Sequence, residues 1–296
     1  MKQSIPLSIE GFYQFSVHPF RLTPDPYFIY QTQSLIQAKR TLLQFITTDD
    51  GILLIDARPG LGKTILLQHF SELPLARIKA FFIQSFNLSP DELFETIAYA
   101  LKLKPEKTKA KNLLLISLFC KKLRKQGFHP ILILDEIDSL MPETLKELGI
   151  LMNINFSSKP LFQLILSGHT QINEIFTNKS LQIITDKVLH HISLSPLKRN
   201  EIQGYIEHRL ALSQGHPPNL PSGKSSDYLF RFSEGIPRII NLIIYRLLLL
   251  GAQEQKHDLT FIDFHKVIHE LHNEGLLPKD KPQESAHLKK RGMPCQ

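Results

Sequence analysis

The segment with the clearest chemistry is LLIDARPGLGKTILLQHF, residues 53–70. An apolar run is followed by a glycine-containing turn, and then by a segment with helical spacing of apolar residues. In a phosphate-binding loop, backbone N–H groups and a helix N-terminus converge on an anion, the lysine reaches the β- and γ-phosphates, and the hydroxyl reaches Mg²⁺. The residues predicted to hold a nucleotide here are Ala57, Arg58, Pro59, Gly60, Leu61, Gly62, Lys63, Thr64 and Ile65.

The first position of this loop departs from the usual pattern G-x-x-x-x-G-K-[ST], because Ala57 stands where a glycine is expected. If the position needs only ordinary backbone angles, alanine costs little. If it needs a positive φ, alanine costs about 1 kcal/mol or more. The sequence leaves both alternatives open.

Two further strand ends carry polar residues of the right type. Apolar residues 131–134 end in Asp135 and Glu136, which predicts that Asp135 holds Mg²⁺ and that Glu136 polarises the attacking water. An acid pair that caps the next helix is the alternative, but the spacing from the phosphate loop favours the nucleotide site. The strand near 161–168 leads to Ser167 and His169, either of which can contact the γ-phosphate or serve only as a turn residue.

A cation also stands at the start of a predicted helix near the C-terminus. Arg238 follows Pro237 in EGIPRII, residues 234–240. A cation near a helix N-terminus is electrostatically unfavourable, so a compensating anion is expected there. A nucleotide γ-phosphate or a surface carboxylate would serve, and we assign both residues to the nucleotide site.

Alternating strands and helices position these residues. The predicted strands are nearly continuous in apolar residues, as strands buried on both faces must be, and they cover 51–57, 77–85, 129–136, 161–168 and 188–195. Helices are predicted after Thr64 and at 89–101, 111–126, 142–152 and 170–177. This alternation predicts a parallel sheet with helices on both faces. From residue 196 only helical periods remain, at 196–213, 224–233, 235–252 and 260–272.

Composition excludes several classes of protein. The 296 residues are 42% hydrophobic and 21% charged, which excludes global disorder. Two cysteines are too few for a disulfide framework and fit a reducing cytosol. Residues 239–252 are too short for a bilayer, which needs about 20 apolar residues, and they include Arg246. We therefore expect a cytoplasmic protein without a transmembrane segment.

The net charge of +7 is concentrated in one stretch. Residues 102–125 hold nine lysines and arginines against the single acid Glu106. The cluster, Lys102–Lys125, is either a solvated linker and helix face or a patch for an acidic partner such as DNA or a membrane surface.

Taken together, these motifs resemble the AAA+ ATPases, and more specifically the general secretion pathway protein A (ExeA-like) family. Helper ATPases of transposition systems share much of the layout. Besides the phosphate loop, the resemblance rests on HPFRLTPDPYFIY (18–30), NLSPDELFETIAYAL (87–101), LILDEIDSLMPETLKEL (132–148), PLKRNEIQGYIEHRL (196–210) and EGIPRIIN (234–241).

The resemblance implies an α/β fold of the P-loop NTPase type. It would be a three-layer αβα core with a parallel five-stranded sheet of order 5-1-4-3-2, plus a C-terminal all-helical lid. The expected domains are an N-terminal segment near the nucleotide (1–30), the core (31–195), the lid (196–275) and a disordered basic tail (276–296). ATP and Mg²⁺ would bind, with Thr64 and Asp135 on the metal, and Glu136, Lys63 and Arg238 in catalysis.

The expected function is that of a Mg²⁺-dependent ATPase that works as an assembly or secretion-type motor or switch, with a homo-oligomer and an unidentified protein as partners. Family members usually continue into a membrane helix and a peptidoglycan-binding part, which we expect to be missing here. Lys187 and Thr185 stand where the family tends to have arginines, so hydrolysis is expected to be slow unless another arginine such as Arg199 substitutes. The alternatives are a DNA-associated transposition-helper ATPase and a nucleotide-binding module with weak hydrolysis.

Overall fold

The computed structural model describes residues 8–277, apart from residues 86, 158, 170, 171, 173–180 and 221–223. Most of the helix predicted at 170–177 and nearly all of the predicted tail lie outside the described residues. The chain divides into two compact units. The first unit is residues 23–195, and the second combines the residues up to Leu22 with those from Pro196 onward.

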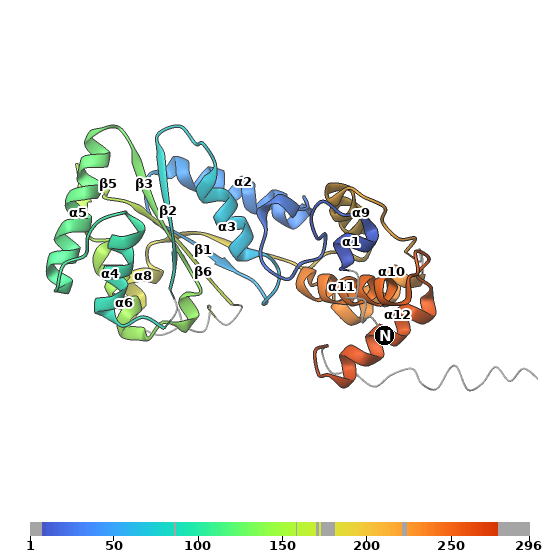
Figure 1. Ribbon diagram of the computed structural model, residues 1–296. Coiled ribbons are helices and arrows are strands. Elements are labelled where there is room, and N and C mark those ends of the chain that lie inside the picture. Colours follow the sequence, from blue (N-terminus) through green and yellow to red (C-terminus); the bar gives the residue numbers. More distant parts are fainter. Residues whose placement is uncertain are drawn as a thin grey trace, which may run out of the picture. The chain divides into compact units, whose positions relative to one another are not determined.

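The first unit is built on a five-stranded sheet in which every neighbouring pair of strands is parallel (Figure 1). Its strands are β1 (Ile52–Asp56), β2 (Ile78–Gln84), β3 (His129–Asp135), β6 (Gln163–Gly168) and β7 (Val188–Ser193). The order is β2-β3-β6-β1-β7. Numbered along the chain, this is the order 5-1-4-3-2, so the implied topology is confirmed. Every residue of β1, β3 and β6 is buried, which explains their unbroken apolar runs.

Two hydrophobic clusters cover the two faces of this sheet. One face carries Leu54, Leu132 and Leu166 and packs against residues of α4 (Pro90–Ala100), α5 (Lys109–Lys125) and α6 (Pro142–Leu151). The other carries Leu53, Ile133 and Ile165 and packs against α2 (Gln33–Thr48) and α3 (Lys63–Glu72). Alternate strand residues point to opposite faces, so each strand feeds both clusters. The three-layer αβα prediction is confirmed.

Several local details match the sequence and others were not expected. Ser89 and Glu92 form the predicted capping box of α4, with Pro90 at the first helical position. The sequence analysis missed α2, a 3₁₀ turn at Pro26–Phe28, the short helix α8 (Gln182–Thr185) and a small hairpin of β4 (Asn155–Phe156) and β5 (Lys159–Pro160).

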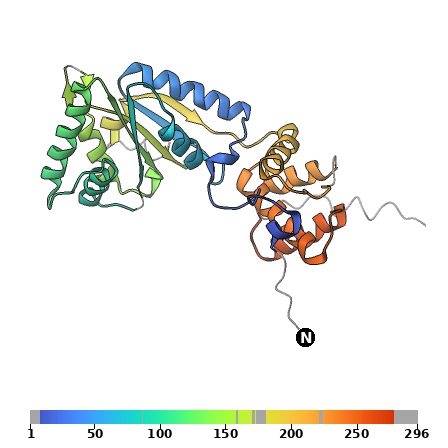
Figure 2. The same cartoon turned by 45° about the horizontal axis from the view of Figure 1, so that its top comes forward.

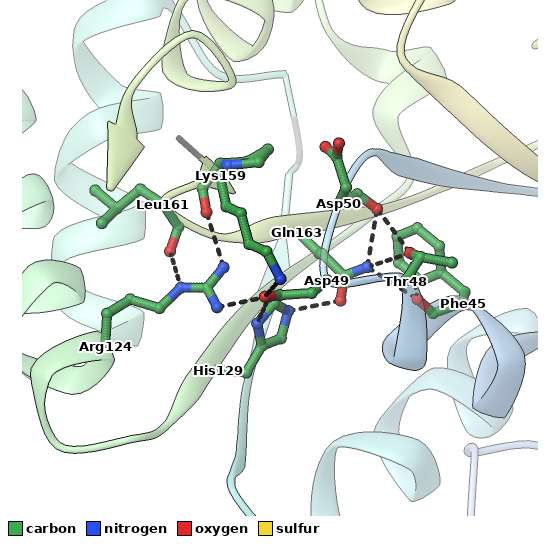
Figure 3. Close-up of polar contacts among 10 residues, drawn as sticks. Phe45, Thr48, Asp49, Asp50, Arg124, His129, Lys159, Leu161 and Gln163 are labelled. Atoms are coloured by element: carbon green, nitrogen blue, oxygen red, sulfur yellow. Dashed lines mark hydrogen bonds and ion pairs between the residues drawn. The ribbon is translucent and has the colours of Figure 1, made fainter. Parts of the chain in front are cut away.

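A charged cluster holds the amino-terminal ends of the central strands together (Figure 3). Asp49 accepts from Arg124 at 2.6 Å and from Lys159 at 2.9 Å, and it also contacts the ring of His129. The other ring nitrogen of His129 lies 2.6 Å from the side-chain oxygen of Gln163. Burial by itself would raise the pKa of Asp49, but the hydrogen bonds from Arg124 and Lys159 outweigh it and lower that pKa.

The second unit is helical in its described part (Figures 1 and 2). Its helices are α1 (Ile9–Tyr13), α9 (Ile202–Ser213), α10 (Lys224–Ser233), α11 (Pro237–Glu254) and α12 (Phe261–Asn273), with a 3₁₀ turn at Arg199–Glu201. Tyr13 is fully buried against Gly251, where an added Cβ would lie 2.2 Å from the Tyr13 hydroxyl. Ser16 donates to the carbonyl of Ser213 at 2.9 Å. Residues 8–22 therefore pack within the helical unit.

No helix among the described residues has both the length and the apolar character that a bilayer crossing requires.

Candidate nucleotide-binding site

The loop after β1 has the backbone geometry of a phosphate cradle. Gly60 and Gly62 have φ values of 85° and 92°, in the left-handed region that strongly favours glycine. Helix α3 begins directly after this loop, at Lys63. Its N-cap residue is Gly62, which has no side chain that could accept a hydrogen bond from the first turn. The first-turn N–H groups of a helix lack partners within the helix and attract anions.

Ala57 fits this loop without strain. It is fully buried, and it is not among the described residues with positive φ. Its N–H donates to the carbonyl of Gly168 at the end of β6, at 3.3 Å. Of the two alternatives left open by the sequence, the structure therefore selects ordinary backbone angles, and no glycine is needed at this position.

The Lys63 side chain is buried and held at two points. Its Nζ donates to the carbonyl of Ala57 at 2.8 Å and lies 3.3 Å from Nδ1 of His169. Burial lowers the pKa of Lys63, while the nearby carboxylates of Asp135 and Asp138 act in the opposite direction.

Asp135 is the best-anchored carboxylate of the site. Thr64 donates its hydroxyl to Oδ2 at 2.6 Å, and Ser167 donates to Oδ1 at 2.6 Å. The backbone N–H of Glu136 also donates to Oδ1, at 3.1 Å. Three donors fix this buried carboxylate beside the Thr64 hydroxyl, so the structure brings the two predicted metal-binding residues into direct contact.

Glu136 has a different environment from its neighbour. Its backbone lies in the left-handed region, with φ 61° and ψ 40°. Its side chain is partly exposed and makes no hydrogen bond or ion pair within the described residues. Non-glycine residues held in this region cluster at functional sites. The Asp135 carboxylate is held by three donors, whereas the Glu136 carboxylate is not. This difference is consistent with two different roles for the acid pair.

Comparison with known proteins agrees with this geometry. Residues 46–176 match the family model described as the AAA domain. The first unit therefore has a fold of the AAA+ P-loop type. It is 24% identical over 262 residues to general secretion pathway protein A of Aeromonas hydrophila, which confirms the resemblance seen in the motifs. That match covers 88% of this chain but only 48% of the relative, so the chain spans about half the relative's length.

Solved structures share the AAA+ fold at low sequence identity. The Aeropyrum pernix ORC1 protein, solved in complex with DNA, has a TM-score of 0.65 at 15% identity, over 86% of this chain and 69% of that one. The Thermotoga maritima RuvB branch migration motor has a TM-score of 0.55 at 17% identity, over 81% and 70% of the two chains. At such identities the likeness shows the fold alone.

The two candidate polar residues after β6 of the AAA+ core have separate environments. Ser167 is fully buried and uses its hydroxyl to hold Asp135, so it contributes to the frame of the site. His169 is 38% exposed in its side chain and lies beside Lys63. Of the two, only His169 lies beside that lysine, and its contact with a phosphate stays a prediction.

The sequence analysis missed two acids of the AAA+ core. Asp138 accepts from the backbone N–H of His169 at 3.0 Å. Asp56, at the end of β1, lies 2.5 Å from Nε2 of His191 and accepts from Ser193 at 3.2 Å. Asp138 stands three residues after Asp135 in the same motif. Its contact with His169, directly after β6, depends on the fold and is not visible in the sequence.

Pro237 and Arg238 belong to the helical unit, so their assignment to the nucleotide stays a prediction. They occupy the first turn of α11, whose N-cap Ile236 makes no side-chain hydrogen bond. Arg238 is exposed and has no hydrogen bond or ion pair in the described part of the chain. The sequence left open whether a surface carboxylate or a γ-phosphate neutralises Arg238, and the described residues provide no such carboxylate.

Lys187, which stands where the family tends to have an arginine, and Arg199, which was considered in its place, both have polar partners. Lys187 donates to the carbonyl of Met152 at 3.1 Å, and Arg199 forms an ion pair with Asp227. In the basic cluster, Arg124 is taken up by Asp49, and Lys109 pairs with Glu147 at 2.8 Å. These two members of the cluster have carboxylate partners, and both interpretations of the cluster stay predictions.

Proposed function

We propose that the chain binds ATP with Mg²⁺ and hydrolyses it. The single observation that carries the proposal is the 2.6 Å contact between the Thr64 hydroxyl and the Asp135 carboxylate, beside the buried Lys63. This contact joins a loop whose glycines have left-handed backbone angles to a strand that ends in an acid pair. A chance Gly-Lys-Thr turn would have no reason to meet a buried carboxylate from another strand.

The oxygen atoms at this contact fit Mg²⁺, which prefers hard oxygen ligands from one or two side chains together with phosphates and water. Thr64 and Asp135 would hold the ion, which when bound would neutralise charge on the phosphate oxygens. Ser167 and the N–H of Glu136 keep the Asp135 carboxylate in place for this task.

The remaining roles follow from exposure and charge. Lys63 would donate to the phosphates, exchanging its present acceptors for phosphate oxygens. Glu136 has a free carboxylate next to the anchored one and would orient and deprotonate the attacking water. Arg238 would supply a further cation to the γ-phosphate, as the resemblance implies.

ATP binding and turnover should be measured for the wild type, Lys63→Ala and Glu136→Gln, with Glu143→Gln as the control. Glu143 is an exposed acid in the first turn of α6. We expect Lys63→Ala to lose binding, and Glu136→Gln to keep binding but lose turnover. A wild type that does not bind Mg-ATP between micromolar and millimolar concentrations would end the proposal. Binding without turnover would leave the nucleotide-binding module as the function.

The role of the ATPase cycle is proposed from the relative. The name of general secretion pathway protein A connects that relative with secretion. For this chain we propose a motor or switch of the assembly or secretion type. We propose that the chain acts on a protein partner, as a homo-oligomer, and in the cytoplasm. Light scattering with and without Mg-ATP tests the oligomer, and a mass that stays that of one chain in both would contradict it.

A DNA-associated role is the second candidate, because α5 has no acidic residue along its 17 positions. Lys107, Lys111 and Lys122 are exposed on or just before this helix. One structural neighbour was solved with DNA. DNA affinity should then fall steeply with salt, and reversing these three charges should abolish it. Turnover that responds to DNA in the wild type and not in the variant would favour this role.

A further inference from the structure

One side of helix α5 faces solvent and carries a stripe of exposed residues. They are spaced by three or four positions, which places them on one side of the helix. The other side packs into the core through Ile116 and Cys120. Figure 1 shows α5 on the outer side of the first unit. The stripe, which we call the α5 face, consists of Lys111, Leu114, Leu118, Lys122 and Lys125.

Two leucines form the middle of the α5 face. Leu114 is 59% exposed and Leu118 is 56% exposed. They stand four positions apart on one helix, so their side chains are neighbours and form one apolar spot. Apolar surface gains free energy when it leaves water. The pair therefore favours a partner that offers an apolar layer of its own.

The lysines on both sides of this leucine pair keep their charge without a counterion. Lys111, Lys122 and Lys125 have no side-chain hydrogen bond or ion pair within the described residues. Helix α5 contains no acid that could neutralise them. The arginine of the helix, Arg124, pairs with Asp49 instead. The α5 face is therefore an apolar spot between positive point charges, and it fits an anionic partner.

The composition of the α5 face distinguishes between three kinds of anionic partner. Nucleic acid offers phosphates to the lysines, but its backbone offers nothing to a pair of leucines. Protein interfaces are enriched in aromatic residues and arginine and depleted of lysine, which is the reverse of this face. Helices that lie on membranes combine lysines with leucines, because headgroups attract the cations and the acyl boundary takes up the apolar side chains. The composition favours an anionic lipid surface.

We propose that the α5 face docks the first unit on an anionic lipid bilayer. Its lysines contact the headgroups, and Leu114 and Leu118 enter the boundary between headgroups and acyl chains, so that α5 lies along the membrane plane. A lysine is a compact charge on a flexible stem and needs no fixed partner geometry, so any anionic headgroup serves. The inference is independent of the proposed ATP site, because α5 contributes no residue to that site.

Flotation with vesicles tests the docking. The anionic vesicles are equal mixtures of phosphatidylcholine and phosphatidylglycerol, and vesicles of phosphatidylcholine alone are the neutral comparison. Each lysine near an anionic membrane is worth about fivefold in affinity. Lys122→Gln should therefore weaken binding to anionic vesicles about fivefold. The triple variant Lys111→Gln/Lys122→Gln/Lys125→Gln should weaken it about 100-fold. The wild type should prefer anionic over neutral vesicles by at least as much.

The leucines are tested with the charge held constant. Leu114→Ser/Leu118→Ser should weaken binding to anionic vesicles about tenfold, because two partly inserted leucines are lost. Matched controls lie on α2, which covers the opposite face of the sheet. They are Arg40→Gln and Leu43→Ser, whose side chains are exposed, and both should bind as the wild type does. All of these positions are exposed, so the urea midpoints should confirm that each variant is folded.

Several results would overturn the docking. A wild type that does not bind anionic vesicles, or that binds neutral ones equally well, would do so. Binding that depends on the lysines but not on the leucines would also do so, because charge alone would then hold the protein. Duplex DNA that binds the wild type and the leucine variant equally well, without binding to vesicles, would assign the α5 face to nucleic acid. None of these results bears on the ATP site, since no nucleotide enters the test.

Discussion

The substitution Ala57→Gly restores the usual first residue of the phosphate loop. We expect it to lower the free energy of unfolding without raising the affinity for ATP. Ala57 is fully buried and lies in the cluster of Ile55, Leu66 and Phe70. Removing its methyl group costs about 0.8 kcal/mol in lost burial. Glycine also loses more backbone freedom on folding, at about 0.5–1 kcal/mol. The free energy of unfolding should therefore fall by about 1.5 kcal/mol.

Urea unfolding, followed by a probe in the core unit, measures this change. With a slope of about 3 kcal/mol per molar urea, the midpoint should fall by about 0.5 M. The affinity for ATP should stay within about twofold of the wild type, because Ala57 has no positive φ for a glycine to relieve. A more stable variant, or one whose ATP turnover rises about tenfold, would show that Ala57 strains the loop and that this reasoning is wrong.

Four further outcomes are expected. Asp49→Asn removes the charge that Arg124 and Lys159 share, so the free energy of unfolding should fall by about 2 kcal/mol. ATP affinity should be unchanged, because the proposed nucleotide site is at the other end of the strands, and a lower affinity in the folded variant would contradict this. Burial lowers the pKa of His18, so the unfolded state takes up a proton before the folded state as the pH falls below 6.5. Urea unfolding should therefore show a free energy of unfolding that falls from pH 7.5 to pH 5.5. This fall should be less steep in His18→Gln. Burial raises the pKa of the Cys120 thiol to about 12, so iodoacetamide should label Cys120 only as fast as the core opens, as peptide mass spectrometry can show. Arg238→Ala should slow ATP turnover about tenfold or more if it contacts the γ-phosphate, and unchanged turnover would remove Arg238 from the site.

Much of the first unit could be predicted because its signals are local. A strand buried on both faces must be apolar throughout, and β1, β3 and β6 are. The capping box of Ser89 and Glu92 is a four-residue pattern that marks where α4 begins. The helix α2 was missed although its signals are local as well. Its buried residues Ala38, Leu42 and Phe45 recur at helical spacing, and Thr32 caps its first turn.

The separate roles of Ser167 and His169 needed the structure. Both are polar residues at one strand end, and the sequence gives no reason to prefer either. In the structure Ser167 is buried and its hydroxyl holds Asp135, whereas His169 lies beside Lys63 and stays the candidate for a phosphate contact. The ion pair of Arg124 also needed the structure, because its carboxylate comes from Asp49, 75 residues away in the sequence.

By itself, the sequence determined the phosphate loop, the acid pair and the order of strands and helices, since each depends on residues close together in the chain. The tertiary structure alone decided that Ala57 is unstrained, that Thr64 meets Asp135 and that Asp138 reaches His169. These facts depend on which strands are neighbours and on backbone angles set by packing. Contacts between residues 31 or 71 positions apart leave no periodic pattern that a single sequence could show.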